Sequence, residues 1–259
     1  MPPAIATLAR RSRSAIRAAR NSFFGDSAPP SSGDIPVRPH LLDRGPYFRN
    51  AARILKRHSA QTVDDVAGLC RKYQTPIFGK IGVWELIQKL ALCIDPSDGR
   101  LFCTSQLVHV FQILDEMEAD GVANDEFILA ALVHDLGKVL LLVGERPENV
   151  VGFNDPIRTY EPGCGLHNCT LQWNHDELAY SRVKDHLPEG LAWLVRYHSI
   201  NRATCDPYMD EKDRAYSARY LDVFERYDHG TKSPVFLPKL RMDKYRSVVE
   251  KAFPHPIVF

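Results

Sequence analysis

Apolar residues recur at intervals of three and four along most of the chain beyond residue 47. This spacing is typical of helices that bury one face, and most of the segments end close to Gly, Pro or Asp. No stretch alternates apolar and polar residues for long enough to indicate a strand of a core sheet. We therefore predict an all-α fold. The segments expected to be helical are 48–73, 83–95, 107–121, 125–144, 171–186, 190–200, 213–230 and 244–253.

Three segments lie outside this pattern. The first 25 residues carry five arginines and no acidic residue, which is typical either of an organelle transit peptide or of a basic tail. Residues 26–40 are rich in Pro and Ser and indicate a linker. We therefore divide the chain into a tail and linker, 1–40, and one helical domain, 41–259. Residues 143–170 contain many Pro, Gly and Asn, and we expect a long ordered loop that crosses the surface there.

Composition excludes some partners. The 33 basic and 32 acidic residues nearly cancel, so we expect neither nucleic-acid nor membrane binding. The six cysteines show no paired C-x-x-C spacing, and we read them as reduced thiols in an intracellular compartment. We expect the protein in the cytoplasm, unless residues 1–25 direct it to an organelle. Cys164 and Cys169 lack the second pair that a zinc site needs, so core or loop thiols are the preferred interpretation. We expect a monomer.

Three polar residues interrupt the apolar run AALVHDLGKVLLL, residues 130–142. They are His134, Asp135 and Lys138, and on a helix they lie close together. Burying such groups costs several kcal/mol unless each is paired, hydrogen-bonded or bound to metal. Taken alone, the His-Asp dipeptide favours a buried core histidine with an ion pair over a metal ligand.

Other predicted helices also carry such polar residues, flanked by apolar ones in every case except the helix of Asp228. Four imidazoles and two carboxylates match the number and type of ligands that two first-row metal ions need, and the lack of thiolate favours iron or manganese over structural zinc. Asp135, beside a candidate ligand, is placed to bridge two metals. Such a pair either polarises water for phosphoester hydrolysis or, with redox-active iron, activates O2. The candidate ligands are His109, His134, Asp135, His175, His198 and Asp228.

The remaining histidines lack this setting. His58 and His186, for example, lie in polar helical segments, so we expect surface or supporting roles for them.

The chain resembles the HD-domain superfamily and, within it, the myo-inositol oxygenase family. The resemblance runs from about residue 47 to residue 244 and rests on YFRN, SAQTVDDV, HDLGKV, ENVVG, CGL, WNHDELAY, RYHS and YDHGTK, in family order. Phosphohydrolases of the wider superfamily share the His-Asp pair but not these flanking strings. The resemblance implies an HD-type helical bundle with a dinuclear metal site in its core.

The resemblance also implies a chemistry. It implies a non-haem centre of two iron ions, mixed-valent Fe(II)/Fe(III), with O2 as co-substrate and no organic cofactor. One iron is then held by His109, His134 and Asp228, the other by His175 and His198. Asp135 bridges the two, and it acts with Lys138 in catalysis. The implied reaction opens the ring of myo-inositol to D-glucuronate in a four-electron oxidation.

Substrate contacts follow by position in the motifs. Two of them, Lys138 and Lys232, lie near the metals, where a cation lowers the pKa of a coordinated hydroxyl, while Asp95 accepts hydrogen bonds from hydroxyls farther away. The six implied contacts are Arg49, Asp95, Lys138, Gly152, Ser199 and Lys232.

Two departures from the family concern the substrate. The family places Asp directly after the glycine of VVG, where this chain has Phe153; Asn154 or Asp155 would replace it through a shifted loop. The segment 152–164 is also shorter than in the animal members. Two outcomes follow: weak binding of myo-inositol, which we expect, or preference for a cyclitol that lacks or blocks one hydroxyl.

Three functional hypotheses therefore remain. The first is an inositol oxygenase or a diiron oxygenase of another small polyol, and the second is an HD-type metal-dependent phosphohydrolase. The third is a non-catalytic binding protein, against which the complete set of six ligands argues.

Overall fold

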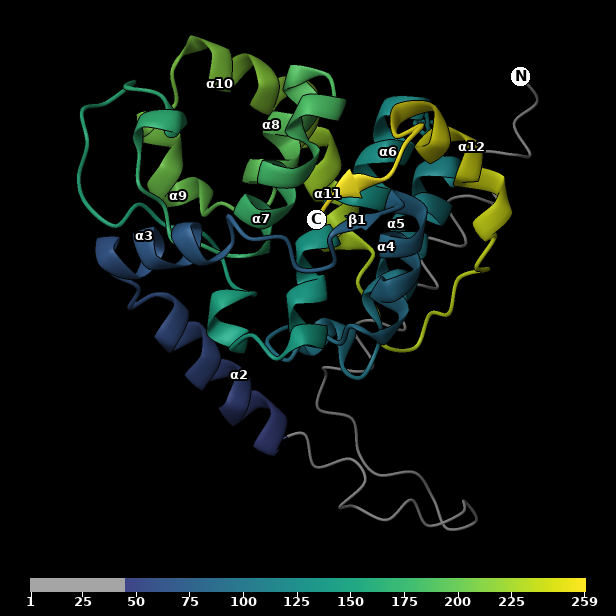
Figure 1. The fold of residues 1–259 in the computed structure, drawn as a ribbon, viewed down its shortest axis with the longest axis horizontal. Helices are drawn as coiled ribbons and strands as arrows, with labels where there is room; N and C mark the ends of the chain where they lie inside the picture. Colours follow the sequence, from purple (N-terminus) through teal and green to yellow (C-terminus); the bar gives the residue numbers. More distant parts are fainter. Residues whose placement is uncertain (1–44) are drawn as a thin grey trace, which may run out of the picture. The chain divides into compact units, whose positions relative to one another are not determined.

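The computed structural model describes residues 45–259, so the predicted tail and linker, 1–40, lie outside the described residues. Within the described part the chain is mostly helical, as predicted (Figure 1). The α-helices are α2 (Gly45–His58), α3 (Val63–Lys72), α4 (Val83–Lys89), α5 (Gln106–Ala119), α6 (Asp125–Val133), α7 (His175–Val183), α8 (Glu189–Tyr197), α9 (Arg202–Cys205), α10 (Glu211–Tyr216), α11 (Asp222–Gly230) and α12 (Met242–Ala252).

Helix packing forms one continuous apolar core. Figure 1 shows α4, α5, α6 and α12 grouped together, with α7, α8 and α10 grouped beside them. Helix α6 packs against α5, α8 and α12, so it connects the two groups. Side chains such as Phe111, Leu132 and Leu194 on α5, α6 and α8 are fully buried in this core. The apolar faces read from the sequence therefore meet one another, as helices of a bundle require.

The described residues contain one small sheet. Strand β1 (Lys80–Ile81) pairs antiparallel with β2 (Ile257–Val258), with Ile81 opposite Ile257. Two residues per strand do not make a core sheet, so the all-α prediction is confirmed. No helix within residues 45–259 is long and apolar enough to cross a membrane.

The helix predicted over 125–144 is interrupted at the polar residues. Helix α6 ends at Val133, and a 3₁₀ helix, η4 (Leu136–Val143), follows Asp135, whose φ of −95° and ψ of 8° are not α-helical. The tight passage of η4 past α7 requires Gly137, since a Cβ there would lie 2.0 Å from the His175 carbonyl oxygen. The prediction of one continuous helix was wrong, because the helix propensity of the sequence carries no information about the contact between Gly137 and α7.

Two other predicted helices are also divided. Segment 48–73 breaks into α2 and α3, because Thr62 and Asp65 form a capping box that begins a new helix. Segment 213–230 contains a π turn, η9 (Ser217–Leu221), between α10 and α11. Turns of this kind are frequent beside functional sites, and α11 carries Asp228.

The segment predicted as a loop, 143–170, is irregular apart from two 3₁₀ turns, η5 (Pro147–Asn149) and η6 (Leu166–Asn168). It does not stay on the surface, however, since Val150 and Val151 are buried. The main-chain NH of His175 donates to the Val150 carbonyl at 3.1 Å, so the loop passes directly beside α7. Its predicted surface course is corrected because its polar main chain finds partners inside the protein.

Candidate metal centre

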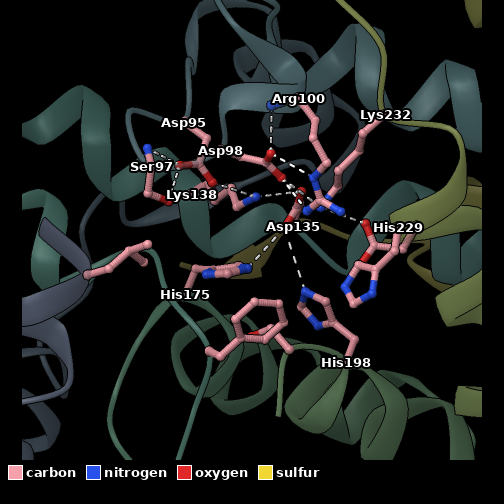
Figure 2. Close-up of a pocket in the computed structure, with 15 residues that line it drawn as sticks. Asp95, Ser97, Asp98, Arg100, Asp135, Lys138, His175, His198, His229 and Lys232 are labelled. Atoms are coloured by element: carbon pink, nitrogen blue, oxygen red, sulfur yellow. Dashed lines mark hydrogen bonds and ion pairs between the residues drawn. The ribbon is translucent and has the colours of Figure 1, made fainter. Parts of the chain in front are cut away.

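Helix ends bring the six predicted ligands together in the interior. His134 and His198 follow the last residues of α6 and α8, and His175 is the first residue of α7. Asn174 caps α7 by accepting a hydrogen bond from the NH of Asp176, which fixes the start of that helix. All six predicted ligands are buried. Figure 2 shows Asp135 at the centre of the site, with His175 and His198 on one side of it.

Asp135 belongs to two clusters at once. Its Oδ2 lies 3.2 Å from Nε2 of His134, and its Oδ1 lies 3.0 Å from Nε2 of His175 and 3.6 Å from Nε2 of His198. His109, His134 and Asp135 form one group of potential metal ligands, and Asp135, His175 and His198 form the other. One carboxylate oxygen facing each group is the arrangement that a bridging ligand needs.

The ring orientations of three of the four histidines fit metal binding. His134, His175 and His198 each place Nδ1 against a main-chain carbonyl oxygen. Because a carbonyl oxygen only accepts, Nδ1 carries a hydrogen, and Nε2 is the nitrogen left to bind a metal. The acceptors are Ala131, Val150 and Val195, at 3.0, 2.6 and 3.0 Å respectively. Within residues 45–259, Nε2 of His134 and of His175 has no hydrogen-bond partner, as expected of nitrogens kept for a metal.

Asp228 lies beside the first group. Its Oδ1 is 2.8 Å from Nε2 of His109 and 3.1 Å from Nζ of Lys232. Although burial opposes the charged form, Lys232 and His109 hold the pKa of Asp228 well below its ordinary value. Asp228 is therefore a carboxylate, as a metal ligand must be.

The buried ammonium of Lys138 is paired with carboxylates, which explains why a charged side chain is stable in the interior. Its ammonium lies 3.0 Å from Asp135 Oδ2, 3.2 Å from Asp95 Oδ2 and 3.0 Å from Gln106 Oε1. Burial opposes the charge, but Asp135 and Asp95 raise the pKa of Lys138 above its ordinary value. Lys138 is therefore a fixed cation, and it contacts the Asp135 oxygen that faces His134, not the one that faces His175 and His198.

Comparison with known proteins identifies the family. A model of the myo-inositol oxygenase family matches residues 49–158 and 147–259. The chain belongs to the myo-inositol oxygenase family. A probable inositol oxygenase of Oryza sativa is 30% identical over 76% of each chain, and inositol oxygenase 1 of Arabidopsis thaliana is 28% identical over 76% of each. Inositol oxygenase of Rattus norvegicus is 28% identical over 76% of this chain and 82% of its own.

A cavity of about 140 Å³ opens above the cluster in this member of the family. Five of the six predicted substrate contacts line it: Asp95, Lys138, Gly152, Ser199 and Lys232. Arg49 is the exception. It lies exposed on α2 and is not among the lining residues of the described structure. The structure therefore does not bring Arg49 to the site.

Ser199 faces the cavity with its hydroxyl already engaged. Its Oγ donates to Asp176 Oδ2 at 2.6 Å and accepts from Asn174 Nδ2 at 3.1 Å. Its main-chain NH also donates to Asp176. Ser199 therefore links His198 to the start of α7.

Asp176 is a site residue that the sequence interpretation missed. It is fully buried, and its Oδ1 lies 3.1 Å from Nε2 of His175 and 3.6 Å from Nε2 of His198. That oxygen has no hydrogen-bond partner within residues 45–259. The sequence contained a signal, because Asp176 follows His175 as Asp135 follows His134.

Asp98 and Arg100 were missed as well. Both line the cavity, and Arg100 grips Asp98 through two hydrogen bonds of 2.9 and 2.7 Å. Lys232 lies 3.4 Å from the same carboxylate, and these partners hold the pKa of Asp98 below its ordinary value despite burial. The signal was the short spacing from Asp95 within IDPSDGR.

The shifted-loop alternative for Phe153 is wrong. Asn154 is buried, and its Nδ2 donates to Asn174 Oδ1 at 3.1 Å. Asp155 points toward α9, where its Oδ1 accepts from Thr204 at 2.6 Å. Neither residue lines the cavity, whereas Phe153 does.

The cysteines are all free, as predicted. Sγ of Cys164 and Sγ of Cys169 lie 3.7 Å apart, but they belong to no group of three potential metal ligands within residues 45–259.

Proposed function

We propose that this chain is an inositol oxygenase that uses O2 to open the ring of myo-inositol to D-glucuronate. Membership of the family supports this proposal, as does the shared function in the names of the plant and mammalian relatives. The observation that carries it is Asp135, which presents one oxygen to each of two buried histidine groups. A dinuclear centre needs such a ligand, and a single-metal enzyme does not.

The proposed cofactor is a pair of iron ions in an HD-type bundle, mixed-valent Fe(II)/Fe(III) when active, with no organic group. His109, His134 and Asp228 would hold one iron, His175 and His198 the other, and Asp135 would join them. When bound, the irons supply the redox chemistry that O2 requires.

Charged residues around the cavity would orient the polyol. Lys138 and Lys232 are cations beside the cluster, so they favour the deprotonated form of a substrate hydroxyl that reaches it. The raised pKa of Lys138 makes it a donor and a fixed charge rather than a base. Asp95 and Asp98 stay ionised because their cationic and hydrogen-bonding partners lower their pKa values despite burial, so both accept from hydroxyls.

We further propose that the enzyme acts as a monomer in the cytoplasm, without nucleic acid. Its free cysteines and its net charge of +1 support this view.

The deciding experiment combines metal analysis with turnover. Protein loaded anaerobically with iron is expected to bind about two irons per chain, and with myo-inositol it is expected to consume O2 and form glucuronate in equal amounts. Manganese-loaded protein tested on phosphoesters under argon serves as the matched control. Phosphoester hydrolysis without O2 uptake would establish the phosphohydrolase instead, and one tightly bound metal per chain would reject the dinuclear centre.

A further inference from the structure

The cavity has a charged side and an apolar rim. Figure 2 shows Asp95, Asp98, Lys138 and Lys232 gathered on one side of it. The apolar rim, which we define as Leu55 and Phe153, also lines the cavity. These two side chains are 39% and 48% exposed, whereas the four charged residues are nearly or fully buried. A polyol bound between them therefore meets these charges at its inner end, and at its outer end it meets the apolar rim beside the partly exposed Arg100, which also lines the cavity.

Three oxygen atoms next to the apolar rim already have partners in the protein. The Gly152 carbonyl accepts from Asn174 Nδ2 at 2.9 Å, and the Phe153 carbonyl lies 3.0 Å from His58 Nε2. The Ser199 hydroxyl donates to Asp176. A substrate hydroxyl at this end would therefore leave water without finding a free acceptor among these three oxygens.

His58 fixes the position of the apolar rim. It was expected at the surface or in a supporting role, and it is buried at the end of α2, with Nδ1 2.9 Å from the Glu148 carbonyl. Its ring lies against Gly152, where an added Cβ would come within 2.5 Å of it and where φ is 125°. Leu55 is on the same helix. Helix α2 therefore positions both residues of the apolar rim, Leu55 directly and Phe153 through His58. Phe153 cannot move away from the cavity without breaking the contacts of His58.

Phe153 also packs on the cavity side. Its ring lies edge to face with that of His229, with centroids 5.8 Å apart. His229 itself faces Glu225 and Asp228, at 3.4 and 3.5 Å. This contact keeps the aromatic ring at the mouth of the cavity.

We propose that the cavity selects an inositol that carries an O-methyl ether on the carbon facing the apolar rim, in preference to unsubstituted myo-inositol. The inference rests on the proposed function, and it names the substrate class of the same site. A methyl ether removes the hydroxyl donor that has no partner there and adds a methyl group against Leu55 and Phe153. One such group in an apolar pocket changes affinity by about tenfold or more.

The reaction itself is unchanged by this substituent. The ether lies at the outer end of the ring, away from the hydroxyls that meet the charged side. The ring carbons lose four electrons and O2 gains four, so one oxygen atom enters the product and the other leaves as water. The product is the corresponding O-methyl ether of a glucuronate.

Anaerobic calorimetry on the iron-loaded enzyme tests the proposal without relying on turnover. Myo-inositol is compared with its mono-O-methyl ethers, one ring position at a time. We expect one ether to bind about tenfold more tightly than myo-inositol. Phe153→Asp is expected to reverse that order, while Phe153→Leu, the matched control, keeps it because the wall stays apolar. Iron content of both variants shows that they remain folded.

The outcomes separate the two proposals. If myo-inositol binds at least as tightly as every ether and forms glucuronate, the selectivity is overturned and the inositol oxygenase stands. If Phe153→Leu and Phe153→Asp lose the preference equally, the apolar character of the wall is not the cause and the inference fails. If no cyclitol binds or consumes O2, the proposed function fails as well.

Discussion

The buried cluster has two halves, one with His109, His134 and Asp228 and one with His175 and His198. They differ in the charges that face His109 in the first half and His198 in the second. In the first half, His109 contacts Asp228, which also contacts Lys232. Burial and the charge of Lys232 lower the pKa of His109 to about 4. In the other half burial again opposes the charge, but Asp176 and Asp135 raise the pKa of His198 to about 9. The same residue type in the same interior is therefore neutral in one half and protonated in the other.

This difference concerns the protein without metal. A proton on His198 provides the positive charge that Asp135 and Asp176 attract, and a metal must displace it. His109 already has Lys232 nearby and needs no proton. We therefore expect that loading of the half containing His198 releases a proton near neutral pH and that loading of the other half does not.

Removing Asp135, the ligand shared by the two halves, should have the largest effect, since both halves lose a ligand at once. Asp135→Ala is expected to lose both metals, because each ion is left short of a ligand. His198→Ala is the matched control and should lose only the metal of its own half. Elemental analysis after anaerobic loading measures both. A full metal complement in Asp135→Ala would exclude a bridging role.

Asp176→Asn should affect one half alone. The substitution keeps the shape and removes the charge that faces His175 and His198, so affinity for the second metal should fall about 10- to 100-fold. The first metal should be retained. Competition with a chelator gives the two affinities separately, and an equal loss from both halves would contradict the assignment of Asp176 to one of them.

The pH dependence of stability should be smaller, and it should appear only without metal. The folded pKa of His198, about 9, lies above its ordinary value of 6.5. Its contribution is therefore complete below about pH 6.5 and is lost as pH rises through about 9, with a change on the order of a few kcal/mol. Thermal unfolding of metal-free protein at about pH 6 and pH 9 measures it. In His198→Gln the difference in stability between the two pH values should shrink, and in the wild-type protein metal loading should remove it. An unchanged difference in His198→Gln would assign the effect to another group.

Deleting residues 1–38 should have the smallest effect. Among the described residues 45–259, the predicted ligands and the lining residues of the cavity all lie at position 55 or later, so turnover and metal content are expected to be unchanged. Steady-state rates of the shortened and full chains provide the check. A large fall in kcat would give the tail a part in the site that its sequence does not indicate.

The predicted ligands could be found from the sequence because the free-energy cost of burying a polar side chain is visible within a single helix. A His or Asp on the apolar face of a helix needs a reason to be there, and each helix shows this without its neighbours. The structure brings all six together, although their division between two irons stays a prediction. Asp98 and Asp176 escaped because their roles depend on neighbours from distant elements, Lys232 for one and His198 for the other.

Backbone geometry was the harder part to predict. The α-helical pattern continues through Asp135 in the sequence, and only the contact with α7 shows why the α-helix stops. The loop 143–170 contains the turn residues of a surface segment, yet its main chain is satisfied by internal partners. Arg49 was assigned by its place in a motif, and motif position does not specify which way a residue faces.

The contact between Gly137 and the His175 carbonyl restricts how this centre can change over evolutionary time. No side chain fits at position 137 without pushing η4 away from α7; Asp135 directly precedes η4, and His175 is the first residue of α7. A single substitution there alters helix packing and ligand spacing together. New metal preferences or reactions can therefore be reached by exchanging a ligand or a cavity residue, whereas adjusting the spacing would require several simultaneous mutations.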